Sequence, residues 1–353
     1  MSPNLKQMFR DDVLAMKPYV PGEQPLAGKV IKLNTNENPY PPSSTVIAAI
    51  QQAASGLERY PDPLATAFRM RAGEVLGVSP EQILCGNGSD DILTIVTRAF
   101  VAPGSHLRFP YPSYILYRTL AELQGAKSQE VDFAADWSLG AEFFASSDDL
   151  RLVFLPNPNS PTGTLVSREQ IIQLAEQLPC PLLVDEAYVD FAPFTCVDLP
   201  ARYPNIMVSR TLSKSYALAG LRFGYLVAHP EVIQTLRKVK DSYNTDAISI
   251  AGATAAINDQ TWLKTNVERC NATRDRMTTG LRQLGFDVIP SHANFVWCTH
   301  PERQAEPLYQ QLKQNGILVR YMNYPRWSVG LRISVGTDSA IDAMLSLLKN
   351  FVE

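Results

Sequence analysis

The feature that most constrains the fold is an alternation of short apolar segments with helical patterns between residues 80 and 227. The apolar segments are Gln82–Cys85, His106–Phe109, Lys127–Val131, Leu152–Leu155, Leu182–Val184, Ile206–Ser209 and Phe223–Val227. Helical patterns over Asp91–Ala102, 113–124 and 168–177 separate several of them. Nearly continuous apolar strands that alternate with helices are typical of a mostly parallel sheet covered on both faces. The sequence therefore predicts an α/β fold.

The pattern changes after residue 230 and predicts a second, smaller α+β domain. A long helical region over about 230–284 leads to short strands and a final helix. These strands are expected at 286–289, 294–298, 317–320 and 331–335, and the helix at 338–351. Two helices are expected earlier, over 44–55 and 63–76. The predicted organisation is a proline-interrupted, irregular segment over 1–40 that packs with the small domain, a large domain over 41–235, and a linking helix with the small domain over 236–353.

Composition excludes several classes of function. The 32 basic and 35 acidic residues give a net charge of −3, unlike the basic footprint of a nucleic-acid binder. No apolar run approaches the roughly 20 residues of a membrane span, and the chain opens without an apolar signal region. Five widely spaced cysteines indicate reduced thiols, and the absence of Cys-x-x-C and His-x-x-x-His pairs argues against a metal site. We expect a cytoplasmic protein without membrane or nucleic-acid partners.

The most informative stretch runs from Ser209 to Tyr225. Hydroxyl side chains surround Lys214, and Arg222 follows after a small Ala-Gly turn. A lysine amine can form a Schiff base with an aldehyde cofactor. A cofactor phosphate would need hydroxyl donors and a planar guanidinium, and this one segment offers both. The alternative is a solvated lysine in a loop rich in Ser and Thr.

Seven further motifs accompany the lysine segment. They are Asn34–Pro39, Arg59–Asp62, Gly86–Asp90, Pro110–Tyr114, Pro156–Gly163, Val184–Tyr188 and Leu331–Thr337. Together with the lysine segment they resemble the fold type I aminotransferases that use pyridoxal 5′-phosphate (PLP), and in detail the histidinol-phosphate aminotransferase family. The resemblance covers almost the whole chain. It implies the PLP-dependent transferase fold type I, with a mostly parallel central sheet in the large domain.

The resemblance implies that Lys214 carries PLP and, once freed, moves a proton between substrate and cofactor. The residues that would hold the PLP phosphate are Gly88, Ser89, Asp90, Thr211, Ser213 and Arg222. The residues themselves support part of this assignment, because the turn at 88–90 lies between a predicted strand and a helix. Free backbone N–H groups and the positive end of the helix dipole favour a phosphate there. The alternative is an ordinary turn in which Asp90 caps the helix.

Asp185 ends a predicted apolar strand, where carboxyl ends of strands form the usual ligand crevice. The resemblance implies that its carboxylate supports the protonated pyridine nitrogen of PLP. Asn157 and Tyr188 would donate hydrogen bonds to the phenolic oxygen, with Asn157 also near the substrate, and Tyr111 would stack on the ring. A core or turn aromatic is the alternative for Tyr111. Strand alternation turns Glu186 to the other face, so it is interpreted as a structural ion-pair partner.

Two arginines are candidates for binding substrate anions. Arg332 lies in an apolar strand pattern, where a charge is unfavourable unless it meets an anion such as a carboxylate. The alternative is an edge-strand arginine that faces water. Arg320 could hold a second anion such as a phosphate. By resemblance, Tyr19 lies near the substrate ring, and Tyr60 reaches the PLP phosphate of the other subunit, which implies a homodimer.

The resemblance implies transamination between L-glutamate and imidazole-acetol phosphate, which yields 2-oxoglutarate and L-histidinol phosphate in histidine biosynthesis. Two segments depart from the common family pattern and leave the substrate open. Pro325-Arg326 stands where Pro-Gly is common, and Ser242–Asp246 also differs. The alternatives are an aromatic amino-acid aminotransferase, a PLP-dependent threonine-phosphate decarboxylase, and a non-catalytic two-domain binding protein.

Overall fold

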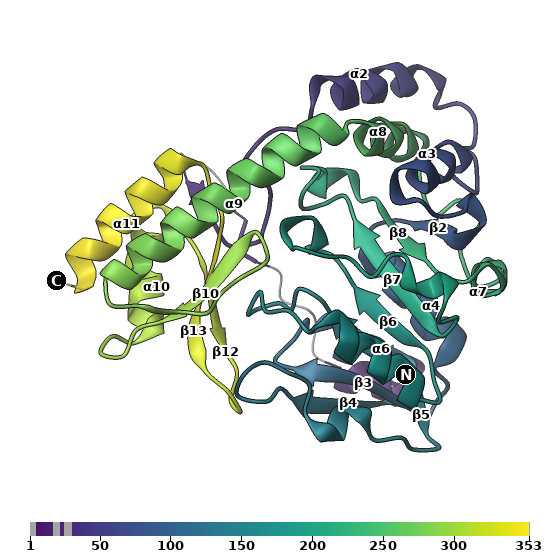
Figure 1. Cartoon of the computed structure of the whole chain (residues 1–353), viewed down its shortest axis with the longest axis horizontal. Coiled ribbons are helices and arrows are strands. Elements are labelled where there is room, and N and C mark those ends of the chain that lie inside the picture. Colours follow the sequence, from purple (N-terminus) through teal and green to yellow (C-terminus); the bar gives the residue numbers. More distant parts are fainter. Residues whose placement is uncertain (1–4, 17–21, 25–29, 353) are drawn as a thin grey trace.

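The computed structural model describes residues 5–16, 22–24 and 30–352. It contains a large and a small domain that lie side by side (Figure 1). The long helix α9 (Gln260–Gln283) runs from one domain to the other and belongs to the packing of both. No helix in these described ranges is long and apolar enough to cross a membrane.

The large domain is built on a seven-stranded sheet. Its spatial order is β2 (Ile83–Gly86), β8 (Gly224–Val227), β7 (Ile206–Thr211), β6 (Leu182–Asp185), β5 (Leu150–Pro156), β3 (His106–Tyr111) and β4 (Lys127–Asp132). Only β8 runs antiparallel to its neighbours, and the other pairs are parallel. The predicted α/β fold with a mostly parallel sheet is therefore confirmed.

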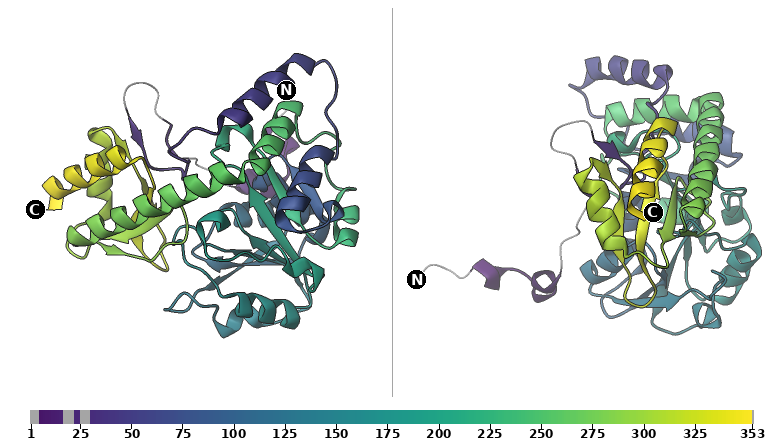
Figure 2. Two further views of the ribbon diagram at one scale, coloured as in Figure 1. Left: turned by 45° about the horizontal axis from the view of Figure 1, so that its top comes forward. Right: turned by 90° about the vertical axis from the view of Figure 1, so that its left-hand side faces the viewer.

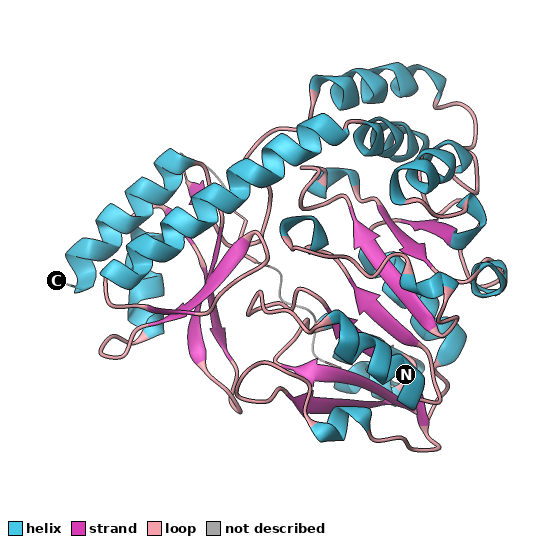
Figure 3. Cartoon of the chain, in the orientation of Figure 1, coloured by secondary structure: helices cyan, strands magenta, loops and turns pink. Residues whose placement is uncertain are grey.

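Helices cover both faces of this sheet (Figure 3), and strand β5 shows why its residues 152–156 are all apolar and buried. Leu152 and Phe154 pack against α4 (Ser89–Phe100) and α5 (Leu116–Leu123), whereas Val153 and Leu155 pack against α6 (Arg168–Gln177) on the opposite face. A strand buried on both faces has no position for a solvated side chain. A further group of helices closes the β2–β8 end of the sheet. These are α2 (Ser44–Ala53), α3 (Thr66–Leu76) and α8 (Ala247–Asn258).

The helical region expected over 230–284 is not continuous. It divides into α7 (Pro230–Leu236), α8 and α9, with residues 237–246 between the first two. Asp246 accepts a hydrogen bond from the backbone N–H of Ser249 at 2.8 Å and so begins α8. Asp259 accepts one from the N–H of Trp262 at 3.1 Å and begins α9. Aspartate at these positions satisfies N–H groups that a helix leaves free at its start, and this capping separates the helices.

The small domain has an antiparallel sheet in the order β12 (Arg320–Asn323), β13 (Val329–Ser334), β10 (Phe295–Thr299) and β9 (Asp287–Val288). Helices α9, α10 (Ala305–Gln314) and α11 (Asp338–Val352) pack on it. The strand expected at 317–320 is instead two: β11 (Ile317–Leu318) leaves the sheet, and β12 forms a hairpin with β13.

The N-terminal segment is more regular than expected where it is described. Strand β1 (Ile31–Lys32) pairs in parallel with β11 of the small domain. A short helix, α1 (Asp11–Ala15), lies against α5 of the large domain, beside the hydrogen bond from Arg10 Nη2 to the carbonyl of Leu123. In the side view of Figure 2 this part of the chain projects from the main body. The described N-terminal residues therefore contact both domains.

Candidate active site

A cavity of about 1470 Å³ lies between the domains, at the carboxyl ends of the parallel strands. Most of the predicted site residues line it. They are Ser89, Asp90, Tyr111, Asp185, Tyr188, Thr211, Ser213, Lys214, Arg222, Arg320 and Arg332. The first nine come from the large domain and the two strand arginines from the small domain. The structure thus gathers side chains that are up to 243 positions apart in the sequence, from Ser89 to Arg332, around one cavity.

Lys214 lies in the loop after β7 and presents its amine to the cavity. Its Nζ donates a hydrogen bond to the backbone carbonyl of Thr35 at 3.4 Å and lies 5.6 Å from the centre of the Tyr188 ring. The side-chain amide of Asn38 donates to the backbone carbonyl of Lys214 at 2.9 Å. Residues from the N-terminal side of the chain therefore fix both the backbone and the amine of this lysine.

The start of helix α4 forms a compact cradle for an anion. Gly88 has a φ of +85°, and a Cβ on it would lie 2.6 Å from Nη2 of Arg222. A Cβ on Gly224 would lie 2.4 Å from the backbone nitrogen of Ser89. Nη1 of Arg222 also donates to Oγ of Ser213 at 3.4 Å. Only glycine allows the backbone N–H groups of the helix start and a guanidinium to come this close, which is an arrangement suited to a phosphate.

Asp90 has a different part in this cradle. Its carboxylate lies 3.4 Å from Nη2 of Arg222 and accepts a hydrogen bond from the hydroxyl of Tyr114 at 3.3 Å. A carboxylate repels a phosphate, so only the backbone N–H of Asp90 suits anion binding. The side chain instead orients Arg222.

Asp185 is a buried carboxylate at the wall of the cavity, only 5 % exposed. It accepts hydrogen bonds from the hydroxyls of Tyr117, at 2.7 Å, and Ser209, at 3.0 Å. Burial raises its pKa above the ordinary value, although both hydrogen bonds act in the other direction. No ion pair joins Asp185 to a cation in the part of the chain that the structure describes. A buried carboxylate in this state favours a cationic N–H on its ligand.

Sequence reasoning did not single out either hydroxyl beside Asp185. Ser209 could have been found, because it faces Asp185 directly in the parallel register of β6 and β7. Tyr117 carries no comparable signal, since it is one aromatic residue on a predicted helix.

Of three other residues predicted to contact the cofactor, two line the cavity and one does not. Tyr111 and Tyr188 line the cavity, and the hydroxyl of Tyr188 accepts a hydrogen bond from the amide of Asn36 at 3.0 Å. Asn157 is buried, and the described residues that line the cavity do not include it. Its amide accepts from the N–H of Val166 at 2.8 Å and donates to the carbonyl of Val166 at 3.2 Å. Asn157 therefore braces the loop after β5, and its contact with a ligand stays a prediction.

The small-domain side of the cavity carries paired positive charge. Arg320 and Arg332 are direct partners in the antiparallel register of β12 and β13. Arg332 donates to Oγ of Ser160 at 3.1 Å and to the carbonyl of Asn34 at 3.2 Å, while its buried Nε has no hydrogen-bond partner among the described residues. Like charges directly opposite each other are destabilising in a sheet. An anion between them removes this repulsion, so the pair is suited to a carboxylate or phosphate.

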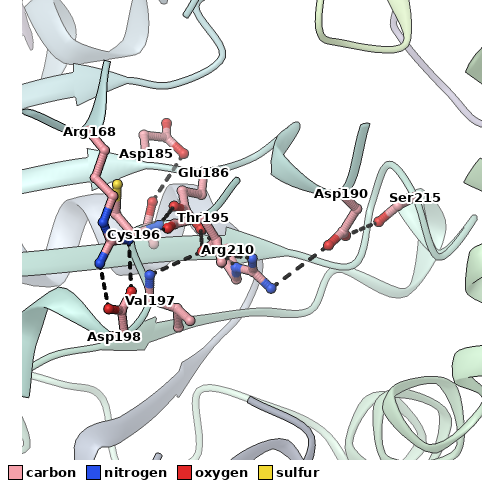
Figure 4. Close-up of polar contacts among 11 residues, drawn as sticks. Arg168, Asp185, Glu186, Asp190, Thr195, Cys196, Val197, Asp198, Arg210 and Ser215 are labelled. Atoms are coloured by element: carbon pink, nitrogen blue, oxygen red, sulfur yellow. Dashed lines mark hydrogen bonds and ion pairs between the residues drawn. The ribbon is translucent and has the colours of Figure 1, made fainter. Parts of the chain in front are cut away.

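Glu186 points away from the cavity into a charged network (Figure 4). Its carboxylate accepts hydrogen bonds from Oγ1 of Thr195 at 2.7 Å and from Nε of Arg210 at 3.0 Å. Arg210 also faces Asp190 at 3.8 Å, and the hydroxyl of Ser215 donates to Asp190. The interpretation of Glu186 as a structural ion-pair partner is confirmed.

One predicted site residue lies apart from this cavity, and another lies outside the described residues. Tyr60 is 82 % exposed, stacks on Tyr243 with ring centres 4.7 Å apart, and is absent from the described residues that line the cavity. Tyr19 lies outside the described residues.

Comparison with known proteins identifies the family. The model of the aminotransferase class I and II family matches residues 28–348. The chain belongs to this family. Among curated relatives, the histidinol-phosphate aminotransferase of Rhodopirellula baltica is 59 % identical over 347 residues, covering 98 % of this chain and 96 % of the relative. Histidinol-phosphate aminotransferase 1 of Trichormus variabilis is 46 % identical, with 98 % and 99 % covered.

A solved structure shows the same architecture. The crystal structure of histidinol-phosphate aminotransferase from Sinorhizobium meliloti, in complex with pyridoxal-5′-phosphate, matches with a TM-score of 0.90 and 27 % identity. The match covers 98 % of this chain and 97 % of that one. The predicted resemblance to this family of aminotransferases is therefore confirmed.

Proposed function

We propose that this aminotransferase is a PLP-dependent histidinol-phosphate aminotransferase. It interconverts imidazole-acetol phosphate and L-glutamate with L-histidinol phosphate and 2-oxoglutarate, a step of histidine biosynthesis. The observation that carries this proposal is one cavity that holds a lysine amine, a phosphate cradle and a separate arginine pair. The full-length relative at 59 % identity supports the choice of substrate. We assign the enzyme to the cytoplasm, where its five buried free cysteines stay reduced.

The residues at the cavity fit PLP. The cradle of Gly88, Ser89, Ser213 and Arg222 suits its phosphate, and buried Asp185 suits a protonated ring nitrogen. When bound, PLP supplies an aldehyde that captures an amine and a ring that accepts electrons from the substrate's α-carbon.

The chain's own groups act around that chemistry. Lys214 would hold the cofactor through its amine and would carry a proton to and from the substrate's α-carbon. The carbonyl of Thr35 and the ring of Tyr188 contact this amine and orient it. Asp185 would stabilise a proton on the ring nitrogen, and Tyr111 would cover the ring. We also assign to Tyr188 and Asn157 hydrogen bonds to the phenolic oxygen.

Both half-reactions place an anionic group away from the reacting amine. Glutamate brings a side-chain carboxylate, and histidinol phosphate brings a phosphate ester. We assign these groups to Arg320 and Arg332, because guanidinium groups bind either oxyanion through parallel N–H donors. Tyr19 completes the substrate site in this proposal.

The proposed enzyme is a homodimer in which Tyr60 reaches the phosphate cradle of the other subunit. Exposed apolar side chains gather on and beside α2 and α3, which supports an interface there. They are Ile47, Leu57, Tyr60, Leu64, Met70 and Val75, with Tyr243 adjacent. A tyrosine that is exposed on its own chain gains a function when a second copy covers this face.

The proposal is tested by mixing the PLP-loaded protein with glutamate, histidinol phosphate, phenylalanine and threonine phosphate in turn. The visible absorbance band of the cofactor reports each reaction. We expect glutamate and histidinol phosphate to convert the band fastest, and Lys214→Ala to abolish turnover while PLP still binds. Conversion by phenylalanine roughly tenfold faster than by histidinol phosphate contradicts the substrate assignment, as does carbon dioxide release from threonine phosphate.

A further inference from the structure

The turn between β12 and β13, residues 324–328, reaches from the small domain to the large one. In Figures 1 and 3 the tip of this hairpin meets the end of β4 and the loop that follows it. We call residues 324–328 the cross-domain turn. It contains Arg326 at the position where the sequence departs from the common Pro-Gly pattern.

Arg326 makes three contacts with the large domain. Its Nη2 lies 3.1 Å from Oε2 of Glu130 and 3.2 Å from Oδ1 of Asp132, both on β4. Its guanidinium lies 4.0 Å from the centre of the Tyr111 ring. Tyr111 lines the cavity, whereas the described lining residues do not include Arg326. The arginine therefore contacts Tyr111 from outside the cavity.

Aromatic contacts extend the same junction. Tyr324 meets Tyr111 edge to face with centres 5.8 Å apart, and Trp327 meets Trp137 of the large domain at 5.2 Å. Trp327 also packs on Trp297 of strand β10 at 4.7 Å. Each side of the junction is thus anchored in its own domain, and the rings meet between them.

The position of Arg326 over an aromatic ring distinguishes it from an arginine that only forms surface ion pairs. Exposed ion pairs contribute little, and the side chains of Arg326 and Asp132 are 49 % and 60 % exposed. The contact of Arg326 with Tyr111 is different, because a planar guanidinium over an aromatic face restricts where that ring can lie. The restricted ring is the one assigned to the cofactor.

We propose that Arg326 is a positioning residue, which holds Tyr111 in place and ties the cross-domain turn to β4 so that the cavity stays closed around its ligands. The role deepens the proposed function and rests on it. Arg326 touches no reacting atom and acts through Tyr111 and through the distance between the domains. Its loss should weaken substrate binding more than it slows the chemical step.

The test compares Arg326→Ala, Arg326→Lys and wild type as PLP-loaded enzymes. We expect Arg326→Ala to raise KM for both glutamate and histidinol phosphate roughly three- to tenfold, with kcat changed less than about twofold. Arg326→Lys should recover part of the affinity, because it keeps the charge but loses the planar stacking group. The matched control is Arg202→Ala, since Arg202 is an exposed arginine over the ring of Tyr203 and outside the described cavity lining.

A second readout needs no catalysis. Quenching of tryptophan fluorescence by acrylamide, far below the melting temperature, reports the exposure of the four tryptophans, of which Trp137 and Trp327 meet at this junction. We expect stronger quenching in Arg326→Ala, an intermediate value in Arg326→Lys, and no change in Arg202→Ala. Unchanged KM and unchanged quenching in Arg326→Ala overturn the proposal.

The two readouts separate this proposal from the proposed function. If wild type does not react with histidinol phosphate, the proposed function fails, and the quenching series still decides whether Arg326 holds the domains together. If Arg326→Ala does not fold, Arg326→Lys carries the test, because it keeps the charge and removes the planar group over Tyr111. Quenching in Arg326→Lys no stronger than in Arg202→Ala then counts against the role.

Discussion

At the scale of single residues, Asp185 shows how stability is given up for chemistry. A carboxylate at the wall of the cavity, 5 % exposed and held by two neutral hydroxyls, is an unfavourable group in the protein without its ligand. Burial raises its pKa, so folding disfavours the charged form. The same charge becomes favourable once a cationic ring nitrogen lies against it. The residue is therefore placed for the bound state rather than for the free one.

We predict opposite effects of Asp185→Asn on activity and stability. Turnover should fall roughly 10²–10³-fold, as when other preorganised electrostatic partners are removed. Near neutral pH, the cofactor-free variant should have a higher free energy of unfolding in urea than cofactor-free wild type, because its side chain carries no buried charge. This difference in the free energy of unfolding should shrink as the pH falls through the raised pKa of Asp185. It should vanish below the ordinary carboxyl pKa, where both proteins carry a neutral group at this position. The control is Asp136→Asn, a change at an exposed position. If Asp185→Asn and wild type are equally stable at every pH, burial does not destabilise the Asp185 carboxylate.

At the scale of elements, the end of strand β6 carries two consecutive carboxylates with separate tasks. Asp185 faces the cavity and Glu186 faces the network of Arg210 and Thr195 on the other side of β6 (Figure 4). The side chains of Glu186 and Arg210 are 1 % and 10 % exposed, whereas those of Arg168 and Asp198 nearby are 31 % and 61 % exposed. The chain thus offers a buried and an exposed ion pair for comparison.

Glu186→Gln should lower the free energy of unfolding by about 3 kcal/mol, because it leaves the buried Arg210 charge poorly compensated. Asp198→Asn, at the exposed pair, should lower it by at most about 1 kcal/mol. Urea titration of both variants measures the difference. Similar losses in the two variants would show that burial does not set the strength of these pairs.

Local pattern sufficed to predict the elements that build the large domain. The alternation of apolar strands with helices predicted a mostly parallel sheet, and most site residues implied by the resemblance meet around one cavity because parallel strands end at the same edge. The hairpin of β12 and β13 and the contact of Arg326 with Tyr111 were not predictable in this way. The Arg326 contact depends on how two domains meet across a sequence separation of about 200 residues, which no local periodicity encodes, whereas the hairpin was missed because one strand was expected over 317–320.

At the scale of the whole molecule, the proposed dimer rests on a surface of the single chain. Its cavity is closed on one side by the small domain through the cross-domain turn. The face formed by α2, α3 and the turn between them exposes apolar side chains, among them Tyr60 at 82 % and Met70 at 53 %. Such a surface is more consistent with an interface than with a solvated face. In the proposed dimer, Tyr60 would then lie at the site of a second copy.

Subunit mixing tests this arrangement. Tyr60→Ala should weaken binding at the phosphate cradle, and Lys214→Ala should be inactive. If Tyr60 acts across the interface, a dimer of one Tyr60→Ala and one Lys214→Ala subunit has a complete site: the lysine of the first subunit faces the tyrosine of the second. Random mixing makes half of the dimers mixed, and each mixed dimer has one complete site of two, so mixing should raise activity toward about a quarter of that of wild type. Mixing Lys214→Ala with Asp185→Asn should give no gain, because both residues belong to the same subunit's site. If the tyrosine mixture also gives no gain while the subunits are shown to exchange, Tyr60 does not act in the partner's site.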